Sequence, residues 1–372
     1  MFFALRDLRT ARGRFALITG VVLLLSVLVA GLLGLTAGLA HQSVSALRAL
    51  GSDGSGFVLP SDDKGAVDLD RAALTDEQVA AVLAEDPSAV PVGLARITLD
   101  DGTATGVSAV AVGLAGPVGS ITPPTGGEVL VSTGVEAEVG AAVEHGDDDD
   151  EVSAGVREIG IGGRSLAVAG DAGDLWHSHT PVVVTDLDTW RELAPRGGAA
   201  TTMAVSADAM SVDAVSADAA GAADDGSGLA LVDSDGLVGA LPSHRAENTS
   251  LNTMTYMLLA VTALVVGAFF AVWGMQRRRD VAVLKALGAS TAAVVRDSVG
   301  QAAIVLAVGI GGGVGIAALV GVAVGGAVPF VVSAGTTLVP AALLAVLGLA
   351  GAAVSLRPVV TADPNSALGA AR

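Results

Sequence analysis

MQRRRDVAVLKALGASTAA, residues Met275–Ala293, is the stretch that decides the fold. Long apolar runs lie on both sides of it, so it is predicted to be a short helix that connects two membrane spans. Val281, Leu284 and Leu287 recur every three residues and therefore share one face of that helix. Such a helix offers a soluble partner a surface to bind and move.

Positive charge predicts that this connection lies in the cytoplasm, because Lys and Arg are enriched on the inner side of membrane proteins. The charged residues are Arg277, Arg278, Arg279 and Lys285. Gly288 is a suitable C-cap, and Ser290 is a suitable N-cap for the helix that follows. The alternative interpretation is an ordinary basic loop that only sets the orientation of the chain.

Composition indicates a membrane protein. The chain has 372 residues, 52% of them hydrophobic, and a mean hydropathy of +0.65, which is too apolar for a soluble protein of this length. It has no cysteine, which excludes disulfides, thiol catalysis and cysteine-based metal sites.

Charge is distributed unevenly along the chain. Residues 41–250 carry 9 Lys/Arg and 34 Asp/Glu, whereas the rest carries 11 Lys/Arg and 4 Asp/Glu. An acidic block between basic flanks predicts an exported domain on a membrane frame with both termini in the cytoplasm. So acidic a block also argues against a nucleic-acid partner, because phosphate contacts need clustered Lys and Arg.

The predicted fold is a polytopic α-helical membrane protein of the cell membrane, with four transmembrane helices and an α+β extracellular domain inserted between helices 1 and 2. The predicted segments are an N-terminal amphipathic cytoplasmic helix at 1–14, transmembrane helix 1 and a stalk at 15–50, the extracellular domain at 51–243, a stalk and transmembrane helix 2 at 244–276, a cytoplasmic helix at 277–291, transmembrane helix 3 at 292–328, an extracellular turn at 329–340, transmembrane helix 4 at 341–356 and a cytoplasmic tail at 357–372.

The first two segments have specific roles in this prediction. Residues 1–14 combine phenylalanines with arginines and are expected to lie against membrane lipid at the inner leaflet. Phe15–Ala40 has 26 residues without a charge, long enough to span. A cleaved signal peptide is the competing interpretation, but its apolar core is only about 7–15 residues long.

Alternating apolar residues and turn signals predict a mixed α+β extracellular domain. Strands are expected at 96–99, 106–112, 128–132, 164–170, 181–185, 201–205 and 228–232, and helices at 69–85, 135–142 and 186–193. In the third span, three pairs of glycines four residues apart predict close helix contact: Gly309/Gly313, Gly311/Gly315 and Gly321/Gly325.

The motifs of self-contained enzymes are absent. There is no phosphate-binding Gly-x-x-x-x-Gly-Lys-Ser/Thr, no Gly-x-Ser-x-Gly and no His-Glu-x-x-His. His177 and His179 form a close histidine pair in a loop, but we predict neither a metal site nor catalytic residues. The predicted spans hold few ionisable groups, which argues against an ion-coupled carrier.

Together these features resemble the MacB/FtsX-like permeases of ABC transporters. The most specific match is RRRDVAVLKALGAS at Arg277–Ser290. Further matches are ALRDLRTARGR at Ala4–Arg14, EVLVS at Glu128–Ser132, GRSLAVAGDAGDLW at Gly163–Trp176, PVVVTDLDTW at Pro181–Trp190 and the tail DPNSAL at Asp363–Leu368.

The resemblance implies a permease that works by mechanotransmission, as a homodimer bound to a separate ABC ATPase subunit that uses the ATP. This chain has no ATPase domain and is not expected to be an enzyme. In the family, the loop between spans two and three is the coupling helix that docks on the ATPase. Carried over, the ATPase-binding residues are Arg279, Asp280, Val281, Val283, Leu284, Lys285, Leu287 and Gly288.

The small outer domain and MFFALRDLRTARGRFALITG at Met1–Gly20 look most like the haem-exporting, HrtB-like branch of this family. Haem iron accepts His, Met or Tyr ligands. The candidate haem-binding residues are His244, Glu247, Met254, Tyr256 and Met257. The alternative interpretation is that Met254 and Met257 are ordinary packing residues and that His244 and Glu247 are ordinary polar residues of the stalk. Haem is expected as cargo and not as a bound cofactor, with a peptide or a lipid-like compound as the alternative cargo.

A second function remains open at this point. FtsX-like members that do not transport act as transmembrane signal transducers that regulate a cell-wall hydrolase. The same four spans, outer domain and coupling helix would serve that role.

Overall fold

The computed structural model describes residues 12–62, 64–100, 106–143, 158–193, 198–206, 228–276, 290–325 and 328–355. The chain divides into two compact units, which we call the helical unit (Met1–Leu39 and Thr249–Arg372) and the sheet-rich unit (Ala40–Asn248). Two continuous helices, α2 (Arg12–Leu50) and α7 (Pro242–Gln276), contribute residues to both units. Each unit is described by itself.

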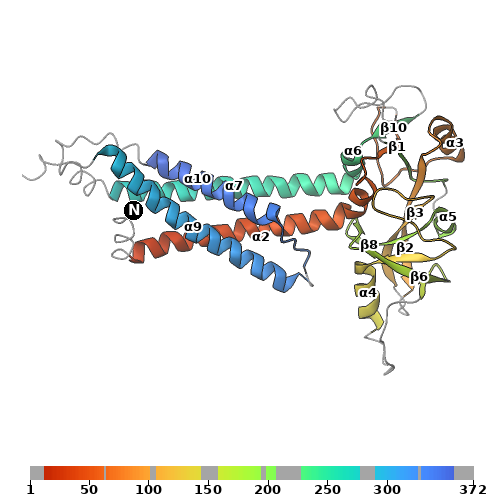
Figure 1. Cartoon of the computed structure of the whole chain (residues 1–372), viewed down its shortest axis with the longest axis horizontal. Coiled ribbons are helices and arrows are strands. Elements are labelled where there is room, and N and C mark those ends of the chain that lie inside the picture. The colour runs from red at the N-terminus through yellow and green to blue at the C-terminus, as the bar shows by residue number, and fades with distance from the viewer. Residues whose placement is uncertain are drawn as a thin grey trace, which may run out of the picture. The chain divides into compact units, whose positions relative to one another are not determined.

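The helical unit holds the predicted spans. Together with α2 and α7, the helices α9 (Thr291–Val324) and α10 (Ala334–Ser355) are long and apolar enough to cross a membrane (Figure 1). The prediction of four such helices, with a sheet-rich domain between the first and the second, is confirmed for the described residues. The extracellular position of that domain stays a prediction.

Helix α10 begins earlier than predicted, inside the segment 329–340 expected to be a turn. The start is fixed by a reciprocal cap, in which Ser333 N donates to Thr336 Oγ1 at 2.9 Å and Thr336 N donates to Ser333 Oγ at 3.2 Å. Pro340 therefore lies within the helix and does not mark its boundary. Ser290 caps α9 as predicted, accepting from Ala293 N.

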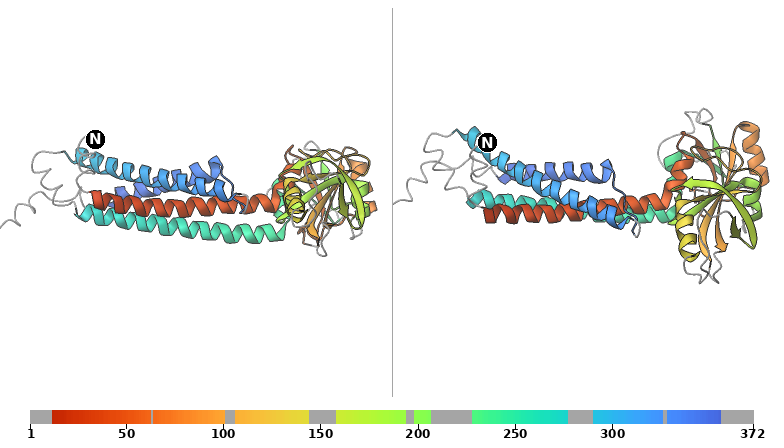
Figure 2. Two further views of the ribbon diagram at one scale, coloured as in Figure 1. Left: turned by 90° about the horizontal axis from the view of Figure 1, so that it is seen from below. Right: turned by 60° about the horizontal axis from the view of Figure 1, so that its bottom comes forward.

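Figure 2 shows the four helices of the helical unit. All four contribute side chains to one apolar core. Phe15 of α2 and Phe270 of α7 both contact the ring of Trp273 edge to face, with centroid distances of 6.2 Å and 6.1 Å. Gln301 of α9 is fully buried and donates to Asp297 at 2.9 Å. The aromatic cluster packs among aliphatic side chains of all four helices, and the helical unit also buries hydroxyl side chains such as Ser26 and Thr262.

Helix α9 approaches α2 closely at two of its glycines. A Cβ placed on Gly309 would meet Val22 Cγ1 at 2.7 Å, and one on Gly313 would meet Leu23 O at 2.5 Å and Ser26 Cβ at 2.6 Å. The same test at Gly311 and Gly315 meets no described atom within 4 Å. Of the predicted glycine pairs, Gly309/Gly313 therefore makes the close helix contact and Gly311/Gly315 does not.

This difference gives a matched stability test. Both Gly313→Ala and Gly315→Ala gain helix propensity, but only the first inserts a methyl group into a filled space. We expect Gly313→Ala to be less stable than Gly315→Ala by about 1–3 kcal/mol, the usual cost of overpacking. Thermal unfolding of the two variants of the full chain in detergent measures the difference, and equal stabilities would contradict the assigned contact.

The sheet-rich unit contains ten strands and four short helices among its described residues. The strands are β1 (Gly56–Pro60), β2 (Val90–Asp100), β3 (Val107–Leu114), β4 (Val129–Ser132), β5 (Glu158–Ile161), β6 (Arg164–Gly173), β7 (Trp176–His177), β8 (Thr180–Asp186), β9 (Thr202–Val205) and β10 (Leu229–Val232). The helices are α3 (Asp76–Glu85), α4 (Thr133–Val143), α5 (Leu187–Leu193) and α6 (Ser234–Gly239).

The strands form one sheet in the order β10-β1-β9-β2-β3-β8-β4-β6-β5, and β7 pairs with β8. Because β5 also pairs with β2, the six strands from β2 to β5 in this order close into a small barrel. One face of the sheet packs on Val44, Leu47 and Leu50 of α2. The barrel interior holds Ile97, Leu99, Val183 and Trp190 with their neighbours.

The barrel contains one close approach that requires glycine. The ring of Trp190, from α5, lies against Gly93 of β2 and Gly113 of β3, and a Cβ at either glycine would collide with it. These two glycines are paired across neighbouring strands. They form the platform on which the tryptophan rests, so α5 can lie close to the sheet.

The sequence prediction finds the main elements of this unit. The hairpin of β2 and β3, the strands β4, β6, β8, β9 and β10, and the helices α4 and α5 are confirmed. Thr75 caps α3 with a complete capping box, but α3 begins at Asp76, later than the predicted 69. The strands β1, β5 and β7 were not predicted. Of the predicted helix at 1–14, residues 1–11 lie outside the described residues, as do residues 277–289 of the predicted helix at 277–291 and the tail at 357–372. The last two residues of the predicted helix at 277–291 belong instead to the cap and first turn of α9.

Candidate functional site

A tight hairpin in the sheet-rich unit carries the histidine pair singled out in the sequence. β7 and β8 pair Trp176 with Pro181 and His177 with Thr180, which leaves Ser178 and His179 as a two-residue turn. Both turn residues have positive φ, 49° and 59°, as a type I′ hairpin requires. This conformation is uncommon without glycine or asparagine, so other contacts must hold it.

The contacts come from the C-terminal part of α2. Ser178 N donates to Ser43 O and His179 N donates to Gln42 O, both at 2.9 Å. Next to the turn, Trp176 N donates to Ser45 Oγ at 2.8 Å. The tip of the hairpin is therefore fixed to one side of α2 by main-chain hydrogen bonds that do not depend on side-chain identity.

Three side chains meet at this junction, one from each element. Ser43 Oγ donates to Glu247 Oε2 of α7 at 3.0 Å. His179 Nε2 lies 3.0 Å from the same carboxylate oxygen and 3.0 Å from Ser43 Oγ. We call Ser43, His179 and Glu247 the junction triad. Glu247 is a residue that the sequence suggested for haem binding; Ser43 and His179 were not foreseen.

The junction triad does not have the geometry of a hydrolase relay. A serine nucleophile needs its base on one ring nitrogen and the orienting carboxylate on the other. Here Ser43 and Glu247 both contact Nε2 of His179. What the triad offers is a carboxylate and an imidazole that are both partly exposed, with side-chain exposures of 28% and 40%.

A second polar cluster lies beside the first. Asp174 accepts from Trp176 Nε1 at 2.6 Å and lies 2.9 Å from His41 Nε2. Thr133 Oγ1 of α4 also donates to it, at 3.4 Å. Asp174 therefore links the start of the hairpin to α2 and α4. Among the described residues, no group of three or more His, Cys, Asp or Glu side chains could hold a metal ion.

The five candidate haem residues lie on α7 in two groups. His244 and Glu247 belong to the sheet-rich unit, where His244 is buried and its Nδ1 has no partner among the described residues. Met254, Tyr256 and Met257 belong to the helical unit, and their side chains are more than half exposed. The candidate ATPase-binding residues 279–288 lie outside the described residues.

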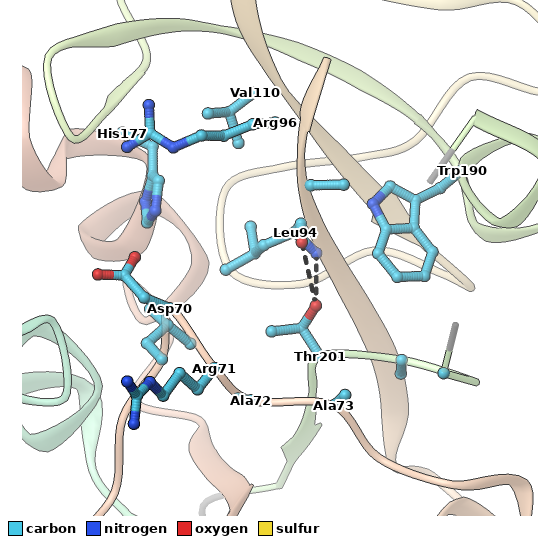
Figure 3. A pocket seen from close by; sticks show the side chains of 14 residues that line it. Asp70, Arg71, Ala72, Ala73, Leu94, Arg96, Val110, His177, Trp190 and Thr201 are labelled. Carbon is cyan, nitrogen blue, oxygen red and sulfur yellow. Dashed lines mark hydrogen bonds between the residues drawn. The ribbon is translucent and has the colours of Figure 1, made fainter. Parts of the chain in front are cut away.

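His177 differs from His179 in its surroundings. It is buried, and its Nδ1 has no hydrogen-bond partner among the described residues. Burial, together with the positive charge of Arg96, lowers the pKa of His177 to about 4. Figure 3 shows its ring beside Arg96 and Asp70. The two histidines of the pair thus face different groups and do not form a common site.

The comparison with known families concerns the part of the chain that begins within α7. Residues 252–364 match the family described as "FtsX-like permease C-terminal". The chain carries an FtsX-like permease domain. This domain includes most of α7 together with α9, α10 and the basic segment between α7 and α9. The resemblance to FtsX-like permeases that the basic segment suggested is thereby confirmed.

The chain is also similar to curated permease proteins. The chain is 25% identical over 142 residues to the "Putative hemin transport system permease protein HrtB" of Staphylococcus epidermidis strain RP62A. It is 28% identical over 142 residues to the protein of that name from Staphylococcus haemolyticus strain JCSC1435. These matches cover 38% of this chain and 40–41% of the relatives. The chain therefore matches less than half the length of each relative.

The buried histidine makes the sheet-rich unit sensitive to acid. The unfolded chain binds a proton at His177 near pH 6.5, whereas the folded chain binds it only near pH 4. Stability from this group is complete above pH 6.5 and falls by roughly 3 kcal/mol as the pH drops toward 4. Chemical unfolding of wild type and His177→Gln between pH 4 and 7.5 measures it.

The contribution of His177 is the difference in unfolding free energy between wild type and His177→Gln, because carboxylates also titrate below pH 5 in both proteins. We expect the unfolding free energy of wild type to drop more steeply than that of His177→Gln between pH 6.5 and 4.5. Parallel curves for wild type and His177→Gln would contradict the assigned burial.

Proposed function

We propose that this chain is the permease subunit of an ABC exporter that works by mechanotransmission and moves a hydrophobic or amphipathic substrate, haem in the first place. The observation that carries the proposal is the FtsX-like permease domain, together with partial similarity to hemin transport permeases. The domain arrangement supports it, because the sheet-rich unit lies between the first and second of four apolar helices.

In this proposal, ATP is hydrolysed by a separate ABC ATPase subunit that binds the segment between α7 and α9. That segment combines positive charge with apolar residues at helical spacing. Movement at the segment would be transmitted along α7, a continuous helix of 35 residues that reaches Glu247. A second copy of the permease would complete the complex, with the sheet-rich units outside the cell.

The proposed coupling helix can be tested by its two faces. Leu284→Asp and Leu287→Asp place a charge on the predicted apolar face, whereas Ala286→Asp places it on the opposite face. We expect the first two to reduce stimulation of the partner ATPase at least about tenfold, as loss of an apolar anchor does. Ala286→Asp should retain most of it. Equal activity of all three variants in a purified complex would contradict docking through this face.

The junction triad is the part of the sheet-rich unit that we assign to haem. An imidazole can ligate haem iron, and a carboxylate can accept a hydrogen bond or pair with a positive charge. His179 and Glu247 are both partly exposed, and Ser43 holds the carboxylate in place. We also propose Met254 and Met257 as haem ligands, on the basis of the sequence.

Haem binding can be measured directly. We expect haemin added to the purified full chain to shift its Soret band, and Glu247→Gln or His179→Gln to weaken the affinity about tenfold. His41→Gln is the matched control, because His41 also lies 2.9 Å from a carboxylate but outside the junction triad. An unchanged Soret band on adding haemin to wild type would contradict haem as the substrate.

The alternative function, a signal transducer for a cell-wall hydrolase, predicts a different result in liposomes. A reconstituted exporter removes haemin from the liposome membrane only when ATP and the ATPase subunit are present. A transducer would show ATPase activity without removing haemin or any other amphipathic compound from the bilayer.

A further inference from the structure

The barrel of the sheet-rich unit is not closed along its full length. β2 pairs with β3 over residues 92–99 on one side. On its other side it pairs with β9 at 90–92 and with β5 at 99–100. Between these pairings no strand among the described residues covers β2. We call residues 93–98 the open edge of β2.

The open edge presents main-chain donors and acceptors. Thr201 Oγ1 accepts from Leu94 N at 2.8 Å and donates to Leu94 O at 3.3 Å, so one side chain occupies the place of a strand. Backbone groups of an antiparallel strand point to its two neighbours in alternation. The N–H and C=O groups of Arg96 and Thr98 therefore point to the same side as those of Leu94.

A cavity of about 410 Å³ lies along this edge. Its volume is in the range of ligand sites in proteins. Figure 3 shows Arg96, His177 and Asp70 on one side of β2 and Trp190 on the other. The cavity thus has a polar wall and an aromatic wall, with the strand edge between them.

Two buried polar groups in the cavity wall lack hydrogen-bond partners. His177 is 6% exposed and Trp190 is 3% exposed. Neither His177 Nδ1 nor Trp190 Nε1 has a partner among the described residues. Buried polar atoms without partners are rare in folded proteins, and a ligand is one of the few things that explains a pair of them in one cavity.

The cavity lining holds two arginines, Arg71 and Arg96, and one carboxylate, Asp70, and this balance favours an anionic group on the ligand. Arg96 Nη1 donates only a long hydrogen bond, 3.4 Å, to Thr180 Oγ1. Among the described residues, no carboxylate lies within ion-pair distance of Arg96. A guanidinium in this situation is well suited to pair with a carboxylate.

We propose that the open edge of β2 binds a short extended peptide, which adds as a strand and places a carboxylate against Arg96. The N–H and C=O groups of Leu94 are already bonded to Thr201, so the groups left to a ligand are those of Arg96 and Thr98. An extended peptide repeats donors and acceptors at the spacing that these two residues present. The side chains of such a strand alternate between the wall of Arg96 and His177 and the wall of Trp190. This assignment is independent of the transport function.

The test uses two degenerate pentapeptide mixtures, both acetylated and amidated, with Glu or with Gln fixed at the centre. Amide hydrogen exchange of the purified full chain is followed at residues 94–98. The Glu mixture at 1 mM should slow exchange at Arg96 and Thr98 about tenfold, as binding with Kd near 100 μM would. No slowing with either mixture overturns the proposal.

Two further comparisons test the mode of binding. The peptides are N-methylated at every second amide, in the two possible patterns. One pattern should abolish protection and the other should retain it, because only alternate amides of the bound strand face β2. Arg96→Gln should weaken the Glu mixture roughly fivefold and leave the Gln mixture unchanged. Arg164→Gln, at an arginine paired with Glu192 outside the cavity, should change neither. Equal effects of both methylation patterns, or of Arg96→Gln on both mixtures, would overturn the proposal.

Discussion

The sheet-rich unit depends on the attachment of one hairpin tip to one helix. Two main-chain N–H groups, those of Ser178 and His179, donate to carbonyls of α2, and this holds the turn in a conformation that its residues do not favour. The same tip brings His179 to Glu247 of α7. The strand pair β7–β8 is held against α2 by further contacts, since Trp176 N donates to Ser45 Oγ and Val182 and Val184 share a core with residues of α2. The junction triad is therefore a consequence of backbone geometry.

The packing of the helical unit rests on other interactions. In a bilayer, apolar side chains give no net driving force for association, so close backbone approach and occasional polar contacts decide how helices pack. Gly309 and Gly313 permit such an approach between α9 and α2, and Gly351 lies against Gly267 between α10 and α7. The hydrogen bond from the buried Gln301 to Asp297 lies within one helix and gives the amide a partner there.

Much of the fold could be predicted from the sequence because its signals are local. Long uncharged runs give the four helices, and alternating apolar residues give the strands β2 and β3. The start of α10 was misplaced because Pro340 was interpreted as a boundary, whereas the cap at Ser333 decides it. The junction triad could not be foreseen, since Ser43, His179 and Glu247 are up to 204 positions apart. The two-residue turn at Ser178 carries no glycine or asparagine that would have marked it.

The packing of Trp190 against Gly93 and Gly113 links three positions far apart in the chain. A methyl group at either glycine would displace the indole, and a smaller residue at 190 would leave a void above both glycines. A side chain at 93 or 113 is therefore compatible with this packing only when the residue at 190 becomes smaller as well.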